Sequence, residues 1–332
     1  MSLLAANTPT LLDYMKSLDP QGKPYMLAEL LSATNEILLD MPFVEANNKM
    51  SHNVGVRTGL PGGYWRMYNL GVLPEKADNV ELTETCGMFE ARNRIDARLV
   101  ERNGNGSAFR ISQDRAFIIG SNKTMATSVF YGNQATDRKQ FTGLAPRFND
   151  ATAQNAGNII NGGGTGSTNT SIWLVVWDSE TVSGFYPEGS KAGLDHKDEG
   201  RGILTDSQGR EHAVYRSCFQ WDIGMYVKDW RYIVRCANID VTTLGKSRLT
   251  GADIVDLMTQ MLERVEDTNM GRAAFYCNRT IRGILRRQIS NTSNVNLSES
   301  QVAGKRVVMF DDIPVRRCDA IVNTEEAITG LS

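Results

Sequence analysis

Residues 51–80 hold two strand-like runs that a tip rich in glycine and proline separates. Polar and apolar side chains alternate over residues 52–58, the sequence GLPGG at residues 59–63 breaks the alternation, and residues 64–70 resume it. The pattern predicts a long two-stranded hairpin. Aromatic and basic residues are mixed on its two faces, namely Tyr64, Trp65, Tyr68, Arg57 and Arg66. Because an isolated hairpin is only marginally stable in water, one of this length needs a surface to lie against, either its own body or a neighbouring subunit.

Helical periodicity or composition marks six other segments. In the segment 107–131, Ser107 is a good N-cap, apolar residues recur at helical spacing, and Gly132 ends the pattern. The segment 90–102 is included because it is rich in good helix formers. The predicted helices are 8–18, 24–40, 90–102, 107–131, 251–267 and 279–289.

Short apolar runs predict strands in the second half of the chain. A polar, glycine-rich loop at residues 150–171 leads into the apolar run 171–177, which indicates a buried strand with residues 181–186 as its hairpin partner. Two aspartates at positions 311 and 312 form a plausible turn between the last two strands. The predicted strands are 171–177, 181–186, 211–220, 225–238, 305–310 and 313–322.

The composition excludes several classes of protein. The chain has 332 residues, of which 41% are hydrophobic, enough apolar surface for a packed core. Its 36 basic and 38 acidic residues nearly balance, whereas a chain that gripped nucleic acid along its length would be clearly basic. The longest apolar run, residues 172–177, is too short to span a membrane, and the N-terminus shows no secretory signal. Five scattered cysteines favour reduced thiols in a cytoplasmic product.

The sequence offers few candidates for catalysis or for binding a metal or cofactor. The three histidines do not have the spacing of a zinc motif. The glycine cluster at Gly162 has Ser167 where a phosphate-binding loop needs lysine, and Lys197 interrupts a calcium-loop-like run at 195–200, for which a solvated turn is the better interpretation. We therefore predict no catalytic, cofactor-binding or metal-binding residue. A carboxylate pair acting in hydrolysis is defined by its separation in space, so that alternative stays open.

The predicted helix 279–289 is basic, with arginines at positions 279, 282, 286 and 287. Such a helix can contact phosphate groups, form ion pairs between subunits, or present a solvated face. The near-neutral charge of the whole chain favours the last two interpretations.

This order of elements, an arm, a long hairpin, a long helix and a strand-rich body with two late helices, resembles the major capsid proteins of tailed bacteriophages. The segments that carry the resemblance are 108–133, 141–145, 171–177, 184–193 and 221–240. Together they resemble the capsid proteins of short-tailed phages with a coat protein of this size, and the likeness extends over most of the chain. The resemblance implies an α+β fold of the Hong Kong 97-like type, with structural rather than catalytic motifs.

The resemblance also implies a division of the chain into five parts. They are an N-terminal arm (1–50), an extended hairpin loop that overlies a neighbouring subunit (51–80), the spine helix and start of the peripheral domain (81–150), strand-rich peripheral and axial sheets (151–245), and axial-domain helices with closing strands (246–332). In the family's archetype the axial helices come before the long peripheral strands. Here the strands at 171–240 precede the helices at 251–289, which leaves open a rearranged connectivity or a different assignment of these blocks.

The implied function is that of a major capsid protein, which assembles as hexamers and pentamers into an icosahedral shell around double-stranded DNA. Its implied partners are other copies of itself, scaffolding, portal and cement or decoration proteins, and DNA by non-specific proximity, with no membrane. It is expected in the virion, and in the host cytoplasm during assembly. The candidate inter-subunit contacts are Arg57, Tyr64, Trp65, Arg66, Tyr68, Lys76, Arg282 and Arg286. The alternatives are a carboxylate-dependent hydrolase or another virion component, such as a tail or decoration protein.

Overall fold

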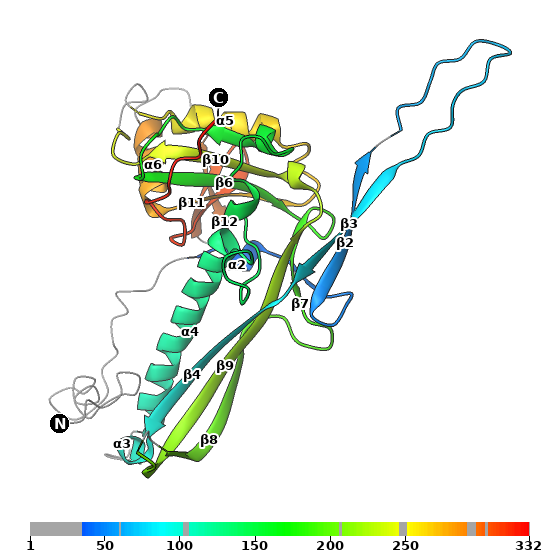
Figure 1. Cartoon of the computed structure of the whole chain (residues 1–332). Coiled ribbons are helices and arrows are strands. Elements are labelled where there is room, and N and C mark those ends of the chain that lie inside the picture. Colours follow the sequence, from blue (N-terminus) through cyan, green and yellow to red (C-terminus); the bar gives the residue numbers. More distant parts are fainter. Residues whose placement is uncertain are drawn as a thin grey trace.

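The computed structural model describes residues 35–59, 61–101, 106–205, 208–245, 251–290, 297–302 and 305–331. The helix predicted over residues 8–18 and most of the one predicted over residues 24–40 lie outside these residues. The described end of the latter is α2 (Ile37–Asp40), which stops at Met41 because the residue before Pro42 adopts an extended backbone. The described chain forms a lobe, an elongated sheet with a long helix beside it, and a projecting hairpin (Figure 1).

The lobe is built on a seven-stranded sheet with β6 (Asn169–Trp177) in its interior. Every residue of β6 is buried, which confirms the buried strand predicted there. β6 pairs antiparallel with β10 (Ile233–Asp240) on one side and with β11 (Arg272–Cys277) on the other. The remaining strands are β5 (Ile159–Asn161) beside β10, and β14 (Ile313–Arg317), β13 (Lys305–Phe310) and β12 (Leu297–Val302) in sequence beyond β11.

Both faces of this sheet are covered, which explains why β6 is apolar over most of its length. Its even-numbered residues from Ile172 to Val176 pack with α5 (Ile254–Arg264) and α6 (Arg279–Ser290). Its odd-numbered residues from Trp173 to Trp177 pack in a second cluster with the C-terminal end of α4 (Gly106–Tyr131). All three helices lie where the sequence predicted helices.

A second, five-stranded sheet extends away from the lobe (Figure 1). Its longest strand is β9 (Glu211–Val227), which pairs antiparallel with β4 (Gly87–Asp96) and with β8 (Asp195–Thr205). β7 (Val182–Tyr186) pairs with the C-terminal end of β9 and also holds the short parallel strand β1 (Phe43–Glu45). The other short elements are the helix α3 (Ala97–Glu101) and the 3₁₀ turns η2 (Ala145–Arg147), η3 (Ala156–Asn158) and η4 (Trp230–Tyr232).

The long helix α4 lies along this sheet and reaches the lobe with its C-terminal end (Figure 1). Phe117 of α4 stacks on Phe219 of β9, with ring centroids 5.6 Å apart. Asp114 of α4 accepts hydrogen bonds from Asn93 Nδ2 at 2.8 Å and from Ser217 Oγ at 3.2 Å. α4 therefore joins the elongated sheet to the lobe.

The projecting hairpin uses a different second strand from the predicted one. β2 (Ser51–Gly59) contains the first predicted strand, but its partner is β3 (Asp78–Thr85), with Arg57 opposite Asn79. Residues 64–70, predicted as the second strand, belong to the long loop between β2 and β3. The prediction paired the nearest alternating runs. The partner of β2 instead lies farther along the chain, in β3. This strand leads almost directly into β4, and the end of β3 is anchored to the body of the protein by Glu84.

The helix predicted over residues 90–102 is wrong for most of its length. Residues 87–96 form β4, and only Ala97–Glu101 is helical. Buried and less buried side chains alternate through much of β4, and all of its 10 residues pair with β9. This pairing outweighs a helix propensity that is worth only a few tenths of a kcal/mol per residue.

Three strand predictions were right in position but wrong in pairing or length. Residues 181–186 are not the hairpin partner of β6, because β7 belongs to the elongated sheet. The strands predicted over 211–220 and 225–238 are instead the single strand β9 and then, after a break at residues 228–232, β10.

Residues 195–200, interpreted as a solvated turn, form the first half of β8. The block 171–240 is divided between the two sheets, because β6 and β10 lie in the lobe while β7, β8 and β9 lie in the elongated sheet. The chain thus passes from the lobe to the elongated sheet and back.

Candidate assembly surfaces

The loop at the tip of the hairpin, residues 61–77, exposes many large apolar side chains. Trp65 is fully exposed, and Tyr68 is 97% exposed. The exposed group, called the tip cluster below, consists of Tyr64, Trp65, Met67, Tyr68, Leu70, Val72 and Leu73. Contiguous apolar groups of this kind on a soluble protein mark surfaces that interact with another protein.

The tip loop is held mainly at its neck. The backbone N–H of Gly63 donates to Oε2 of Glu75 at 2.9 Å, and this hydrogen bond is the main cause that lowers the pKa of Glu75. Lys76 Nζ lies 3.3 Å from Asp78 Oδ1, an exposed ion pair of a kind that contributes little to stability. The tip cluster itself remains open to solvent.

The root of the hairpin, in contrast, is fixed to the body. Arg147 Nη1 lies 2.7 Å from Glu84 Oε1 at the end of β3, and both side chains are mostly buried. His52 of β2 stacks on Tyr226, with ring centroids 4.6 Å apart. Burial and, secondarily, the charge of Lys228 lower the pKa of His52. A fixed root with an exposed tip positions the tip cluster away from its own chain (Figure 1).

The predicted contact residues fall into two groups. One is on the hairpin: Arg57 on β2, and Tyr64, Trp65, Arg66, Tyr68 and Lys76 on the tip loop. The other is on α6, where Arg282 Nη1 lies 3.9 Å from Glu36 Oε1 of the same chain and Arg286 is exposed. Sequence reasoning missed Met67, Leu70, Val72 and Leu73, although apolar residues continuing past position 70 were a visible signal.

A buried carboxylate fastens α4 and the C-terminal segment to the lobe. Glu325 Oε2 lies 2.9 Å from Arg235 Nη2, and both side chains are about 95% buried (exposures of 6% and 5%). The same carboxylate accepts hydrogen bonds from Tyr131 at the end of α4 and from Ser171 of β6. Burial and the negative charge of Glu325 raise the pKa of Tyr131. The cluster is nearly free of solvent, so its role is to hold elements together.

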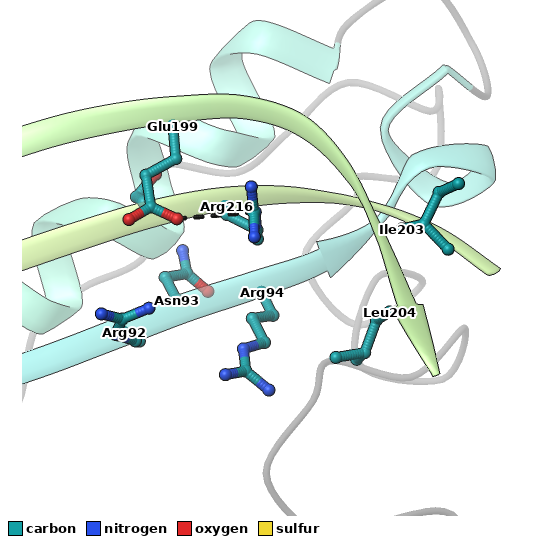
Figure 2. Close-up of a pocket in the computed structure, with 8 residues that line it drawn as sticks. Arg92, Asn93, Arg94, Glu199, Ile203, Leu204 and Arg216 are labelled. Carbon is teal, nitrogen blue, oxygen red and sulfur yellow. Dashed lines mark ion pairs between the residues drawn. The ribbon is translucent and has the colours of Figure 1, made fainter. Parts of the chain in front are cut away.

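A small cavity lies between β4, β8 and β9 (Figure 2). Arg92, Arg94, Arg216, Glu199 and Leu204 contribute to its lining, and Arg216 Nε lies 3.5 Å from Glu199 Oε2. Its volume of about 50 Å³ is well below the several hundred Å³ of a typical ligand site. The cavity has room for water rather than for a substrate.

The described residues contain no group of three or more histidine, cysteine, aspartate or glutamate side chains that could hold a metal ion. No helix in the described part of the chain is long and apolar enough to cross a membrane.

Glu36 and Asp40 converge on Arg316, with ion pairs of 3.3 Å and 3.1 Å. Their charges are thus compensated within the fold. Burial raises the pKa of the Cys236 thiol to about 12, so this buried cysteine is a packing residue.

Comparisons with known proteins agree with this architecture. The model of the family described as major capsid protein GP7 matches residues 19–329. A chain in the structure of bacteriophage Epsilon15 is 37% identical, with a TM-score of 0.78, and the match covers 99% of this chain and 100% of that chain. The capsid of bacteriophage JBD30 is 10% identical over 88% of this chain and 93% of that chain, and its TM-score of 0.52 shows a similar fold. No curated protein matches the chain.

These findings confirm the α+β, Hong Kong 97-like fold and the function that the sequence predicted. The protein is a structural component of the virion of a tailed bacteriophage, where copies of it assemble into the icosahedral capsid shell. The alternatives of a hydrolase and of a tail or decoration protein are not favoured by the family match. The chain belongs to the major capsid protein GP7 family.

Proposed function

We propose that the hairpin tip is the extended loop through which each subunit of the shell lies over its neighbour. The observation that carries this proposal is the tip cluster, which is exposed on its own chain although its root is fixed. Such a group gains stability only when a second copy covers it. Arg66 and Lys76 on the same hairpin would supply polar contacts around it, and Arg57 on β2 stays a predicted contact.

The energetics suit a shell. If the tip buries roughly 500 Å² of apolar surface, the gross gain is on the order of 10 kcal/mol at ~25 cal/mol/Å². Ordering of the loop and the entropy of association offset much of this gain. The remaining contact is modest and reversible, which allows one sequence to occupy several settings and to correct errors of assembly.

The other parts of the chain take the roles that the resemblance implies. Residues 1–50 would form the arm, 51–80 the extended loop, 81–150 the spine helix and the start of the peripheral domain, 151–245 the peripheral and axial sheets, and 246–332 the axial helices with the closing strands. Hexamers and pentamers would be the building units. In this arrangement the buried cluster around Glu325 would hold the spine helix to the lobe.

The proposed partners follow from the shell. Assembly would take place in the host cytoplasm with scaffolding and portal proteins, and cement or decoration proteins would bind afterwards. DNA would lie near the wall without a specific site, because a net charge of −2 avoids the tight binding that a strongly basic lining would cause. The chain would have no catalytic role.

The test is removal of the tip. A variant in which residues 61–76 are replaced by Asn-Gly should fold, because the lost residues are exposed, but it should form no closed shells. Circular dichroism and thermal unfolding report folding, and negative-stain microscopy with sedimentation velocity reports shells. Normal particles from this variant would contradict the proposal.

A matched variant separates the effect of the length of the tip loop from the effect of its apolar side chains. It keeps the length of the tip loop but replaces the seven residues of the tip cluster with serine. If apolar burial on a neighbour drives the contact, this variant fails to assemble as the deletion does. If it assembles normally, the backbone of the loop carries the contact and the tip cluster does not.

A further inference from the structure

Opposite charges are segregated on the two helices that cover one face of the lobe sheet. Residues 251–270, which include α5, carry five carboxylates and one arginine. Residues 272–290, which include α6, carry five arginines and no carboxylate. Both helices pack on the same apolar cluster beneath them, so their charged faces point away from the sheet. Figure 1 shows α5 and α6 at the outer surface of the lobe.

The exposed side of α5 carries one carboxylate near each end of the helix, and the exposed Arg264 lies next to the second of them. Asp256 and Glu263 are exposed and stand seven residues apart, so they lie on one side of the helix about 10 Å apart along its axis. Asp256 accepts a hydrogen bond from Gln260 at 2.7 Å, and Glu266 just beyond the helix lies 3.2 Å from Arg231. Glu263 has no ion pair with any other described residue.

The outward face of α6 repeats this spacing with the opposite charge. Arg279 and Arg286 are exposed and also stand seven residues apart. Neither side chain forms an ion pair with another residue in the described part of the chain, whereas Arg282 between them is partly buried beside Glu36. The two arginines are therefore available to a partner with matching carboxylates.

The two charged faces do not neutralise each other within one chain. Met258 of α5 and Leu285 of α6 belong to the same buried apolar cluster. No ion pair joins the two helices among the residues whose side chains the structure describes. Each subunit thus carries both halves of a complementary contact on its surface, and only a second copy can bring them together.

We propose that the basic face of α6 in one subunit lies against the acidic face of α5 in a neighbouring copy, with Arg279 and Arg286 opposite Asp256 and Glu263. This inference rests on the proposed assembly into rings of subunits. A ring needs a head-to-tail contact between two different surfaces of the same chain, and complementary charge selects the correct pair of surfaces. A polyanion such as DNA is a poorer occupant, because the acidic face of α5 beside α6 would repel it.

Charge reversal tests the pairing in the full-length chain. The double variants R279E/R286E and D256K/E263K each place like charges in contact, so each should raise the critical concentration for shell formation at least about tenfold. The conservative variant R279K/R286K keeps the charges and is the matched control. It should assemble within about threefold of the unmodified chain.

Two combinations then ask whether the two faces meet each other. The quadruple variant R279E/R286E/D256K/E263K restores opposite charges and should recover assembly to within about threefold of the unmodified chain. A mixture of the two double variants should form six-membered rings, in which the two can alternate, at concentrations at which neither variant assembles alone. Failure of both combinations, with every variant folded by circular dichroism, would overturn the pairing. Double variants that assemble as the unmodified chain does would overturn it as well.

The result of the charge-reversal test can be distinguished from the result of removing the hairpin tip. If the unmodified chain and R279K/R286K form shells but R279E/R286E only loses retained DNA, then α6 binds phosphate and this inference is wrong while the shell remains. If removal of the hairpin tip leaves shells intact but charge reversal on α6 abolishes them, the role of the tip is wrong and the pairing of α5 with α6 stands.

Discussion

The lobe and the hairpin tip both carry large aromatic side chains, but they place them in opposite environments. Trp173 in the middle of β6 is 0% exposed, between α4 and the neighbouring strands, whereas Trp65 at the tip is fully exposed. The ion pairs of the two regions also differ in their exposure to solvent. Arg235 and Glu325 in the lobe are buried and fully hydrogen-bonded, while Lys76 and Asp78 at the neck of the tip are in water.

This difference indicates which part of the molecule is stable alone. The buried Arg235–Glu325 pair offsets the cost of burying its charges through hydrogen bonds within one chain. The large apolar side chains of the tip are exposed on their own chain, so under the proposed role they would contribute to stability only when a second subunit covers them. If the proposed role of the tip is right, stability of the subunit and stability of the shell reside in different regions, and substitutions in the two regions should separate them.

The largest effect on folding is expected at the buried carboxylate. Glu325→Ala leaves Arg235 buried without its counter-ion and removes the acceptor of Tyr131 and Ser171. The free energy of unfolding should fall by about 3–5 kcal/mol. Urea denaturation measures it. The adjacent, exposed Glu326→Ala should stay within about 0.5 kcal/mol of the unmodified chain. Equal effects at the two positions would mean that the cluster does not fasten the lobe.

An intermediate effect is expected at the root of the hairpin. Arg147→Met removes the ion pair with Glu84 and the hydrogen bonds to the carbonyl groups of Thr142 and Met225. The expected loss is about 1–3 kcal/mol. Amide hydrogen exchange in β2 and β3 should also accelerate, because the ribbon loses its anchor. The exposed Arg138→Met is the control and should change neither measurement.

Local signals in the sequence were sufficient for the helices. α4, α5 and α6 lie within three residues of the predicted ends. For α4, apolar residues recur at helical spacing between Ser107 and Gly132, the predicted start and stop residues. Local signals failed for β4, whose helix-forming residues pair with β9 more than 100 positions away. They also failed for the strand that closes the hairpin, since the contact that fixes it joins Glu84 to Arg147 across 63 positions.

The candidate assembly surfaces likewise include features that neighbouring residues predict and features that depend on contacts between distant residues. The aromatic tip could be selected from the sequence because the side chains and the turn residues are neighbours in the chain. The placement of Arg282 beside Glu36 could not, because the two are more than 200 residues apart and only the fold brings them together. Likewise, the charges of α5 and α6 are visible in the sequence, but that both faces point outward from one sheet is a tertiary fact.

A small, pH-dependent effect is expected at His52. Its pKa is lowered in the folded chain, from 6.5, by burial and by Lys228, so the unfolded chain binds a proton more readily. The stability that the neutral His52 ring contributes is therefore fully present above pH 6.5 and falls as the pH drops below that value. It is lost below the pKa that His52 has in the folded chain. His52→Phe keeps a ring against Tyr226 and should flatten this part of the stability profile, measured by urea denaturation at several pH values. An unchanged slope would show that another group titrates.

The smallest effect on folding is expected at Trp65, and it is the most informative one. Because this side chain is fully exposed, Trp65→Ala should change the free energy of unfolding by no more than about 0.5 kcal/mol, while it weakens shell formation measured by sedimentation velocity. Trp65→Phe retains an aromatic anchor and should assemble better than the alanine variant. A destabilised subunit with intact assembly would reverse the comparison, because it would show that the tip packs on its own body. Loss of assembly in a fully stable subunit is what separates a contact made between copies from a contact made within one.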